Sequence, residues 1–476
     1  MRRYLVRLLF SLLVMSGLTM PALAQANTQS LAIDAYLDEA MPAASAPGLA
    51  WAILDNGDLR VGSRGERIAG SGLPVSSDTP FALGSVSKSF TALAIMQLVE
   101  AGEVDLDNAV ADYLEGFAGQ PGGAVTIRQL LSHTSGWSTV QGNSFQTGRA
   151  DQDNTLAGNV SQLAETSPAR EAGTAWQYSN ANYLILGAVI EAVSERDFAA
   201  YVETEILAPL GMDDSSVGGR AAGDSMAIGH TPWFGARRPV PVQGGASGGM
   251  APAGGIVASA ADMALYLAMM TNGEDDLITA DHKVMMMRPA SAASPFYGFG
   301  WFIDAEADAA YHTGLTPGVE TLAILSRSQQ RGGVVLVNAN SGMGFGVTGD
   351  ILAGMSAFAL GETPESAGPH LGTQSLYVMV LVLPVLFVAG IVLAWMGRAG
   401  LRAKSGIAGW FSLVFPVFST LAMAWVFVDL MPKLFGAPLA TFYLYQPDMT
   451  ILLVASAVTG VSFSVFRLAL ALSGRR

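Results

Sequence analysis

The chain has 476 residues, of which 51% are hydrophobic and only 13% are charged, and its net charge is −14. This composition is too apolar for an ordinary soluble enzyme, so part of the chain is expected to lie in a membrane. The acidic balance argues against nucleic-acid binding, and the absence of cysteine excludes disulfides and thiol chemistry.

The first 24 residues have the features of an export signal. Three arginines flank the start of Leu8–Met20, an uncharged stretch too short for a good spanning helix, and Ala22-Leu23-Ala24 has the pattern of a cleavage site. We therefore expect a mature chain that begins near Gln25. An uncleaved anchor is the alternative, and either interpretation places the following domain outside the cytoplasm.

Residues 25–361 are predicted to form one globular domain, because apolar periodicity alternates between helical and strand spacing. The expected helices cover Leu31–Met41, Ser85–Ala101, Asn180–Val193, Ala260–Met270 and Gly346–Ala359. The expected strands cover Gly48–Asp55, Arg60–Ser63, Tyr297–Ile303, Thr321–Ser326 and Gly333–Asn338. This order predicts an α+β fold: a mostly antiparallel sheet with terminal helices on one face and a helical insertion on the other.

The first candidate catalytic motif is Ser85-Val86-Ser87-Lys88. The preceding Gly84 allows a sharp turn, which puts Ser85 at a helix N-terminus and Lys88 on the same face one turn later. Serine becomes a nucleophile when a base takes its proton, and a buried neutral lysine is such a base. The chain has only four lysines, and arginine could not serve here because it does not deprotonate. A helix-capping serine beside a solvated lysine is the alternative.

The second motif is Tyr178-Ser179-Asn180. A tyrosine near Lys88 could share its proton as a general acid or base. The asparagine amide could bind a substrate carbonyl and orient the lysine. Alternatively, the tyrosine only packs at the start of a helix.

The third motif is His312-Thr313-Gly314, predicted on an edge strand that faces Ser85. Gly314 would let a substrate approach the backbone, and the N–H of Leu315 could join that of Ser85 as an oxyanion hole. His312 could hold a substrate carboxylate or assist proton transfer. A strand-end histidine without a chemical role is the alternative.

In this order the three motifs resemble the signature of serine penicillin-recognising enzymes: Ser-x-x-Lys, a polar tripeptide, and Lys-Thr-Gly or a variant. Residues 30–360 are similar to the β-lactamase and penicillin-binding protein superfamily. The Tyr-x-Asn form belongs to its branch of class C β-lactamases, D-Ala-D-Ala carboxypeptidases and family VIII esterases. Further matching stretches are Phe90–Ala92, Leu98–Gly102, Leu130–Gly136, Pro252–Gly255 and Tyr297–Trp301.

The resemblance implies a role for each motif residue. The implied catalytic residues are Ser85, Lys88, Tyr178 and His312. The implied substrate-binding residues are Asn180, Thr313 and Gly314, and the backbone N–H groups of Ser85 and Leu315 would hold the oxyanion. Histidine stands first in the third motif where class C β-lactamases have lysine, which favours a carboxypeptidase, aminopeptidase or esterase over an efficient β-lactamase. No metal or other cofactor is expected, because the five histidines lack ligand spacing.

After a linker at 362–374, the last hundred residues are predicted to form a membrane domain of three helices. Apolar stretches at about 375–396, 406–428 and 449–472 are each long enough to cross a bilayer. Basic residues cluster at 398–404 and after the third stretch, so the positive-inside rule places both in the cytoplasm. The loop Asp429–Asp448 would then lie outside, with the globular domain.

These inferences together predict a multi-pass protein of the cytoplasmic membrane with a serine hydrolase domain on the periplasmic or extracellular side. Its expected partners are the lipid bilayer and a peptide, ester or β-lactam substrate, cell-wall fragments included; the sequence indicates no nucleic acid and no particular oligomeric state. The alternative is a non-catalytic or slowly acylated sensor, because three helices are more than an anchor needs. A transporter is disfavoured, since Asp429 and Arg467 lie near helix ends.

Overall fold

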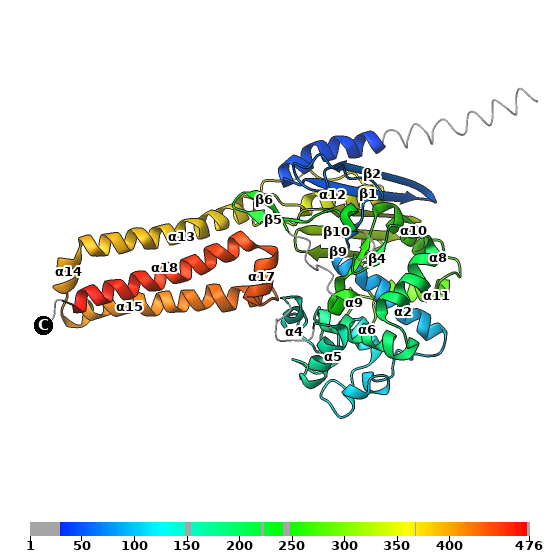
Figure 1. Ribbon diagram of the computed structural model, residues 1–476, viewed down its shortest axis with the longest axis horizontal. Helices are drawn as coiled ribbons and strands as arrows, with labels where there is room; N and C mark the ends of the chain where they lie inside the picture. Colours follow the sequence, from blue (N-terminus) through cyan, green and yellow to red (C-terminus); the bar gives the residue numbers. More distant parts are fainter. Residues whose placement is uncertain (1–28, 148–153, 220–222, 241–247, 367, 474–476) are drawn as a thin grey trace, which may run out of the picture.

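The computed structural model describes residues 29–147, 154–219, 223–240, 248–366 and 368–473, so the predicted signal peptide at 1–24 lies outside the described residues. A globular domain carries a long bundle of helices that projects from one side (Figure 1). The chain enters this bundle through α13 (Leu371–Met396), and α18 (Pro447–Leu472) runs to its far end.

The centre of the globular domain is a six-stranded antiparallel sheet in the order β2-β1-β11-β10-β9-β8. Its strands are β1 (Gly48–Asp55), β2 (Asp58–Gly65), β8 (Phe302–Asp304), β9 (Ala309–Thr316), β10 (Val319–Ser326) and β11 (Arg331–Val337). The pairing of β1 with β11 brings the two ends of the domain together, with Leu49 opposite Val337.

Different helices cover the two faces of this sheet, as the alternation along β1 requires. Leu49, Trp51 and Ile53 belong to a core shared with the helix of residues 29–44 and with α12 (Gly349–Leu360). Ala50 and Ala52 belong to the larger core on the opposite face. These small side chains let α10 (Ala260–Thr271) pack closely on the sheet. The predicted fold class is therefore confirmed.

A helical insertion between β2 and β8 packs against the larger core on the side away from the sheet. Its helices are η1 (Gly84–Val86), α2 (Ser87–Glu100), α3 (Ile127–Leu131), α4 (Thr139–Asn143), η4 (Ser144–Thr147), α5 (Leu156–Glu165), α6 (Asn180–Ser194), α7 (Phe198–Val202), α8 (Ala208–Leu210), α9 (Ala251–Gly254) and α11 (Ala280–Met286). The remaining short strands are β3 (Phe81–Ala82), β4 (Ser216–Val217), β5 (His230–Trp233), β6 (Ala236–Pro239) and β7 (Ile256–Ala258).

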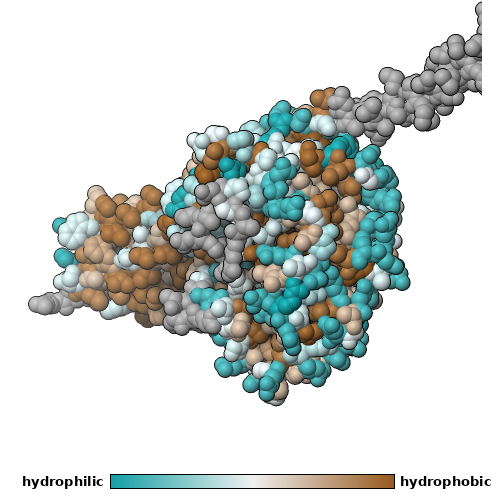
Figure 2. Space-filling model, turned by 45° about the vertical axis from the view of Figure 1, so that its right-hand side comes forward, coloured by the Kyte–Doolittle hydropathy of each residue, from teal (hydrophilic) through white to brown (hydrophobic). Residues whose placement is uncertain are grey.

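The bundle contains three helical spans long and apolar enough to cross a membrane: Leu371–Met396, Gly406–Leu434 and Pro447–Leu472. The second span is made of α15 (Gly406–Trp425), η8 (Val426–Leu430) and α16 (Met431–Leu434), and the short helices α14 (Arg398–Arg402) and α17 (Leu439–Tyr445) lie between the spans along the chain. Hydrophobic residues gather over the bundle, whereas hydrophilic residues dominate the rim of the globular domain (Figure 2). The basic turn at α14 lies at the far end, and α17 lies at the near end beside the globular domain (Figure 1).

A buried carboxylate fixes the bundle to the globular domain. Asp448, only 2% exposed, accepts hydrogen bonds from the backbone N–H of Phe234 at 3.0 Å and from the Tyr377 hydroxyl at 2.8 Å. Phe234 belongs to the turn of the β5–β6 hairpin, whereas Tyr377 lies on α13. Three separate parts of the chain are therefore tied together at one carboxylate.

Several elements differ from their predicted ranges, and two of these differences have a clear local cause. Only Phe302–Asp304 forms a strand where Tyr297–Ile303 was expected, because Gly300 adopts a left-handed φ of 78° and the chain turns, with Gly298 N–H bonded to Trp301 O. The first of the three long apolar helices begins at Leu371 rather than at 375. Its extra turn is polar enough to be mistaken for linker, yet it contains no helix-breaking proline.

Candidate active site

Ser85 lies on the tight turn that leads into α2. Gly84 adopts a left-handed φ of 56°, and a Cβ there would lie 2.6 Å from the backbone nitrogen of Leu315. A side chain at this position would therefore push β9 away from the turn. Ser85 itself is partly exposed, whereas every other residue from Phe81 to Phe90 is buried.

Lys88 lies one turn further along and is completely buried. Its Nζ is 3.2 Å from Ser85 Oγ, 2.7 Å from Asn180 Oδ1 and 2.6 Å from Ala253 O. No acidic side chain pairs with it among the described residues. Burial without a counter-charge lowers the pKa of the Lys88 amine well below its ordinary value of 10.5.

The three neighbours of Lys88 determine what a neutral amine does there. A neutral amine has two N–H groups and one lone pair. The amide oxygen of Asn180 and the carbonyl of Ala253 can only accept, so they take the two N–H groups. Ser85 is the one neighbour with a proton to donate, so the lone pair faces its hydroxyl. This geometry suits Lys88 to deprotonate Ser85.

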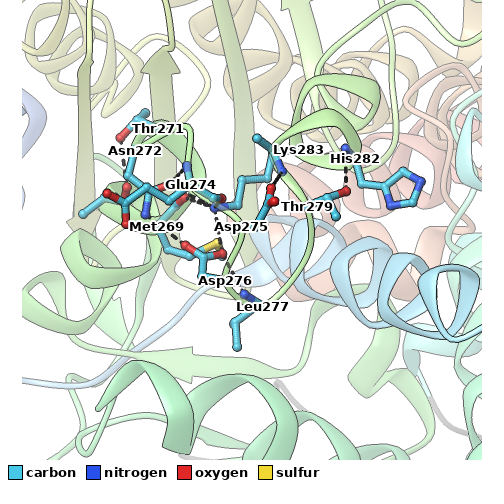
Figure 3. A network of polar contacts seen from close by, with 12 residues as sticks. Met269, Thr271, Asn272, Glu274, Asp275, Asp276, Leu277, Thr279, His282 and Lys283 are labelled. Atoms are coloured by element: carbon cyan, nitrogen blue, oxygen red, sulfur yellow. Dashed lines mark hydrogen bonds and ion pairs between the residues drawn. The ribbon is translucent and has the colours of Figure 1, made fainter.

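The second buried lysine shows a different arrangement (Figure 3). Lys283 Nζ donates to the backbone carbonyls of Met269 and Glu274 and pairs with Asp276 at 2.7 Å. These contacts satisfy the last turn of α10 and the loop after it. Lys283 is therefore a charged structural residue, and the lack of a carboxylate at Lys88 distinguishes the catalytic candidate.

Tyr178 lies against the same amine. The Lys88 Nζ is 4.9 Å from the centre of the Tyr178 ring. The Tyr178 hydroxyl is buried and has no partner in hydrogen-bonding geometry among the described residues. Burial raises the pKa of this hydroxyl, and the neighbouring Ser85 hydroxyl offsets the effect only in part. Tyr178 is therefore a neutral phenol that could donate a proton near Ser85.

His133 holds the second motif in place. Its Nδ1 accepts from the backbone N–H of Ser179 at 3.2 Å and from the side-chain amide of Asn182 at 2.9 Å. Burial lowers the pKa of His133 well below its ordinary value, so the ring is neutral. Its ring also packs against Tyr178, with centroids 4.5 Å apart. These contacts give His133 a positioning role.

His312, the first residue of the third motif, is almost completely buried. Its Nδ1 lies 2.7 Å from Thr313 O, which can only accept, so Nδ1 carries the proton and Nε2 accepts from the Tyr297 hydroxyl at 3.1 Å. Burial, with a smaller effect from a charge on Lys88, lowers the pKa of His312 to about 3. A neutral ring with both nitrogens engaged is poorly suited to hold a substrate carboxylate.

The third motif lies on β9, which is the second strand from the edge rather than the edge itself. However, β8 pairs only with Ala309–Tyr311, so the stretch from His312 onward extends beyond it beside Ser85. Thr313 and Leu315 are exposed, and Gly314 is buried, where a Cβ would lie 1.9 Å from Leu83 O. Glycines at 84 and 314 thus bring the Leu315 N–H close to Ser85, as an oxyanion hole requires.

A pocket of about 540 Å³ opens at this turn. Ser85, Asn180 and Leu315 line it, together with Ala253 and Gly254. Lys88, Tyr178 and His312 lie behind this lining rather than in it. Within the ranges that the structure describes, no three His, Asp or Glu side chains form a metal-binding group. The pocket therefore offers a serine, an asparagine amide and backbone N–H groups to an incoming carbonyl.

The structure brings the residues of all three predicted motifs together around Ser85. Two features were not anticipated from the sequence. Asn143 accepts from the Asn180 amide at 2.8 Å, and so fixes which end of that amide faces Lys88. Tyr443, Leu444, Tyr445 and Pro447, from the C-terminal bundle, line the same pocket as Ser85. No local pattern marks either feature, because both depend on packing between distant segments.

Comparisons with known proteins agree with this geometry. A profile of the family described as Beta-lactamase matches residues 33–354. Penicillin-binding protein 4 of Amycolatopsis lactamdurans is 34% identical over 253 residues, which are 52% of this chain and 64% of that protein. The chain spans a little under two thirds of the length of the curated relatives it matches.

Solved structures give the same result. The octameric penicillin-binding protein homologue from Pyrococcus abyssi is 26% identical, with a TM-score of 0.62 over 70% of this chain and 78% of that one. A D-stereospecific amidohydrolase from Streptomyces sp. is 27% identical, with a TM-score of 0.53 over 65% of this chain and 94% of that one.

Proposed function

Because this chain belongs to the beta-lactamase family, we propose that it is a membrane-anchored, extracytoplasmic serine hydrolase that acts through an acyl-enzyme on Ser85. The observation that carries this proposal is the buried amine of Lys88, whose third neighbour is the Ser85 hydroxyl. The three membrane-spanning candidates and the predicted export signal support the location.

In the first half of the proposed reaction, Ser85 Oγ attacks the substrate carbonyl carbon while Lys88 Nζ takes the hydroxyl proton. The N–H groups of Ser85 and Leu315 stabilise the negative oxygen of the tetrahedral intermediate. The intermediate collapses as the amine or alcohol leaves with a proton from Lys88 or Tyr178. Water then attacks the ester, gives one proton to the same groups, and releases an acid and free Ser85.

The substrate class is a peptide, an ester or a β-lactam, with the first two favoured. Support comes from the histidine at the start of the third motif and from the amidohydrolase among the structural neighbours. We assign His312 to positioning: its neutral ring supports Tyr297 and packs near Tyr178, with ring centroids 6.2 Å apart. Thr313 and Asn180 remain the candidates for contact with the substrate.

Labelling with a fluorophosphonate tests the proposal directly. The full chain in detergent is expected to gain one adduct, located on Ser85 by peptide mass spectrometry. Ser87 and Ser89 provide an internal comparison, because both are buried, and Ser87 Oγ accepts from Ile256 N–H while Ser89 Oγ donates to Val86 O. A folded protein without an adduct, or with one elsewhere, would show that Ser85 is not activated.

The pH dependence of this labelling is expected to follow Lys88. Only the neutral amine can accept a proton, so the rate should rise about tenfold per pH unit below the Lys88 pKa. Because burial lowers that pKa, the plateau should begin well below pH 10.5. No second step is expected near pH 6.5, since the pKa of His312 lies at about 3. A rate that still climbs beyond pH 10.5 would contradict a neutral Lys88.

A slowly acylated receptor is the second candidate. It is favoured by one observation: the Asn180 amide that contacts Lys88 also bonds to Asn143, which contacts the C-terminal bundle. Acylation of Ser85 could therefore alter the contacts between the globular domain and the bundle. The two functions differ in the second half-reaction, because a receptor keeps its acyl group and a hydrolase releases it within one turnover.

A further inference from the structure

The pocket at Ser85 has one wall that does not belong to the globular domain. Tyr443, Leu444 and Tyr445 come from α17, and Pro447 is the first residue of α18, a candidate membrane span. Tyr443 is 41% exposed, so its ring is accessible to a bound molecule. The 435–447 segment, which contains these residues, thus supplies side chains to the catalytic pocket.

Hydrogen bonds hold the 435–447 segment firmly against the site. The side-chain amide of Asn143 donates to Gly436 O at 2.8 Å, and the Thr441 hydroxyl donates to Asn143 O at 3.2 Å. The Tyr445 hydroxyl donates to Gln146 Oε1 at 2.9 Å. These contacts, with those of Asp448, fix the wall at both of its ends. The 435–447 segment is therefore held in a defined position at the pocket by its own hydrogen bonds.

The length of α18 sets the height of this wall relative to a bilayer. Its 26 residues span about 39 Å at the usual rise, more than the roughly 30 Å of a hydrocarbon core. A carboxylate is costly in the hydrocarbon core, so the start of α18, with Pro447 and Asp448, is expected at headgroup level. Phe234 of the globular domain is 44% exposed and is bonded to Asp448, as expected for an aromatic residue at a membrane interface.

The pocket therefore opens where the adjoining leaflet ends. Its wall is apolar at Leu444 and Pro447 and aromatic at Tyr443, whereas its reactive side carries Ser85 and Asn180. A wall of this kind at headgroup level fits a molecule with an apolar chain and a polar, cleavable group.

We propose that Tyr443 and Leu444 of the 435–447 segment form part of the substrate site, and that the substrate is an amphiphile of the adjoining leaflet. Its apolar chain lies against Tyr443 and Leu444, and its ester or amide carbonyl reaches Ser85. This inference rests on the proposed hydrolase function. The Ser85–acyl bond forms as the bond to the alcohol or amine breaks, that group leaves with a proton, and water then releases the acid.

The test uses the full chain in nanodiscs of phosphatidylethanolamine and phosphatidylglycerol. Two pairs of substrates vary the chain on either side of the scissile bond: 4-nitrophenyl octanoate against acetate, and octyl against ethyl D-alaninate. The ratio of kcat/KM for the long and short members is measured in the wild type and in a Tyr443→Ala/Leu444→Ala double variant. Phe435→Ala is the matched control, because Phe435 is an exposed aromatic residue of the same segment outside the pocket lining.

The wild type should have a higher kcat/KM for the long member of at least one pair. In the double variant the ratio of long to short should fall about tenfold, which is the low end of what one methylene contributes to discrimination. Phe435→Ala should keep it, since bilayer partitioning is the same in all three proteins. An unchanged ratio in the double variant would overturn the amphiphile proposal. Fluorophosphonate labelling separates the two proposals: labelled proteins without the effect leave the hydrolase intact, and an unlabelled wild type removes both.

Discussion

Replacing Lys88 by methionine is expected to slow the labelling of Ser85 by roughly 10²- to 10⁴-fold, the range that a positioned general base contributes. Methionine matches the apolar stem of lysine closely but lacks the amine and cannot accept a proton. The fold should survive, because the lost partners are one amide oxygen and one carbonyl, at a cost of about 1–3 kcal/mol. Stopped-flow labelling and a thermal melt measure the two effects separately.

Lys283→Met is the control for this result. Lys283 is equally buried, but its partners include Asp276 and the carbonyls of Met269 in α10 and Glu274 after it. This variant should melt at a lower temperature than the wild type and label Ser85 at the wild-type rate. If both variants lost labelling in step with their stability, the effect at Lys88 would reflect folding, and Lys88 would not be the base.

Replacing Tyr178 by phenylalanine should reduce turnover of a 4-nitrophenyl ester by roughly 10²-fold or more, because a proton carrier beside Ser85 is removed. The ring and its contact with His133 remain. If the phenol acts mainly in the second half-reaction, the acyl-enzyme should accumulate and be visible in the intact mass at steady state.

Tyr183→Phe serves as the comparison for Tyr178. The Tyr183 ring also lies near Lys88, at 5.5 Å, but its hydroxyl donates to Leu131 O. Loss of that bond should cost about 1 kcal/mol of stability and leave turnover unchanged. Equal rates for Tyr178→Phe and wild type would show that Tyr178 only packs in the site.

Much of the fold could be predicted from the sequence because its elements carry strong local signals. The strand Gly48–Asp55 was predicted with the bounds it has, since Pro47 and Asn56-Gly57 punctuate an apolar run. The helix after Ser85 and the three helices long and apolar enough to span a membrane were equally clear. The strand predicted at Tyr297–Ile303 was wrong over most of its length, because the left-handed φ of Gly300 turns the chain and leaves Tyr297 buried with its hydroxyl on His312.

The site could be predicted in part for a related reason. Nucleophile and base lie one helical turn apart, so their contact follows from the sequence. The tautomer and burial of His312 do not, because they depend on Tyr297 and on packing beneath β9. Asn143 and Tyr443 were beyond prediction, since nothing near either residue in the sequence indicates that α17 lies against the pocket.

The docking of the bundle through Asp448 also determines how substrate and enzyme meet. A catalytic domain on a free tether would tumble and sample bulk solution. A domain that is bonded to its membrane-anchored bundle would instead keep its pocket at a constant height relative to the bilayer. Collisions with a leaflet molecule then occur by lateral diffusion in two dimensions. The reaction rate would depend on the surface density of the substrate in the leaflet, and dilution of the vesicles at constant lipid composition would leave it unchanged.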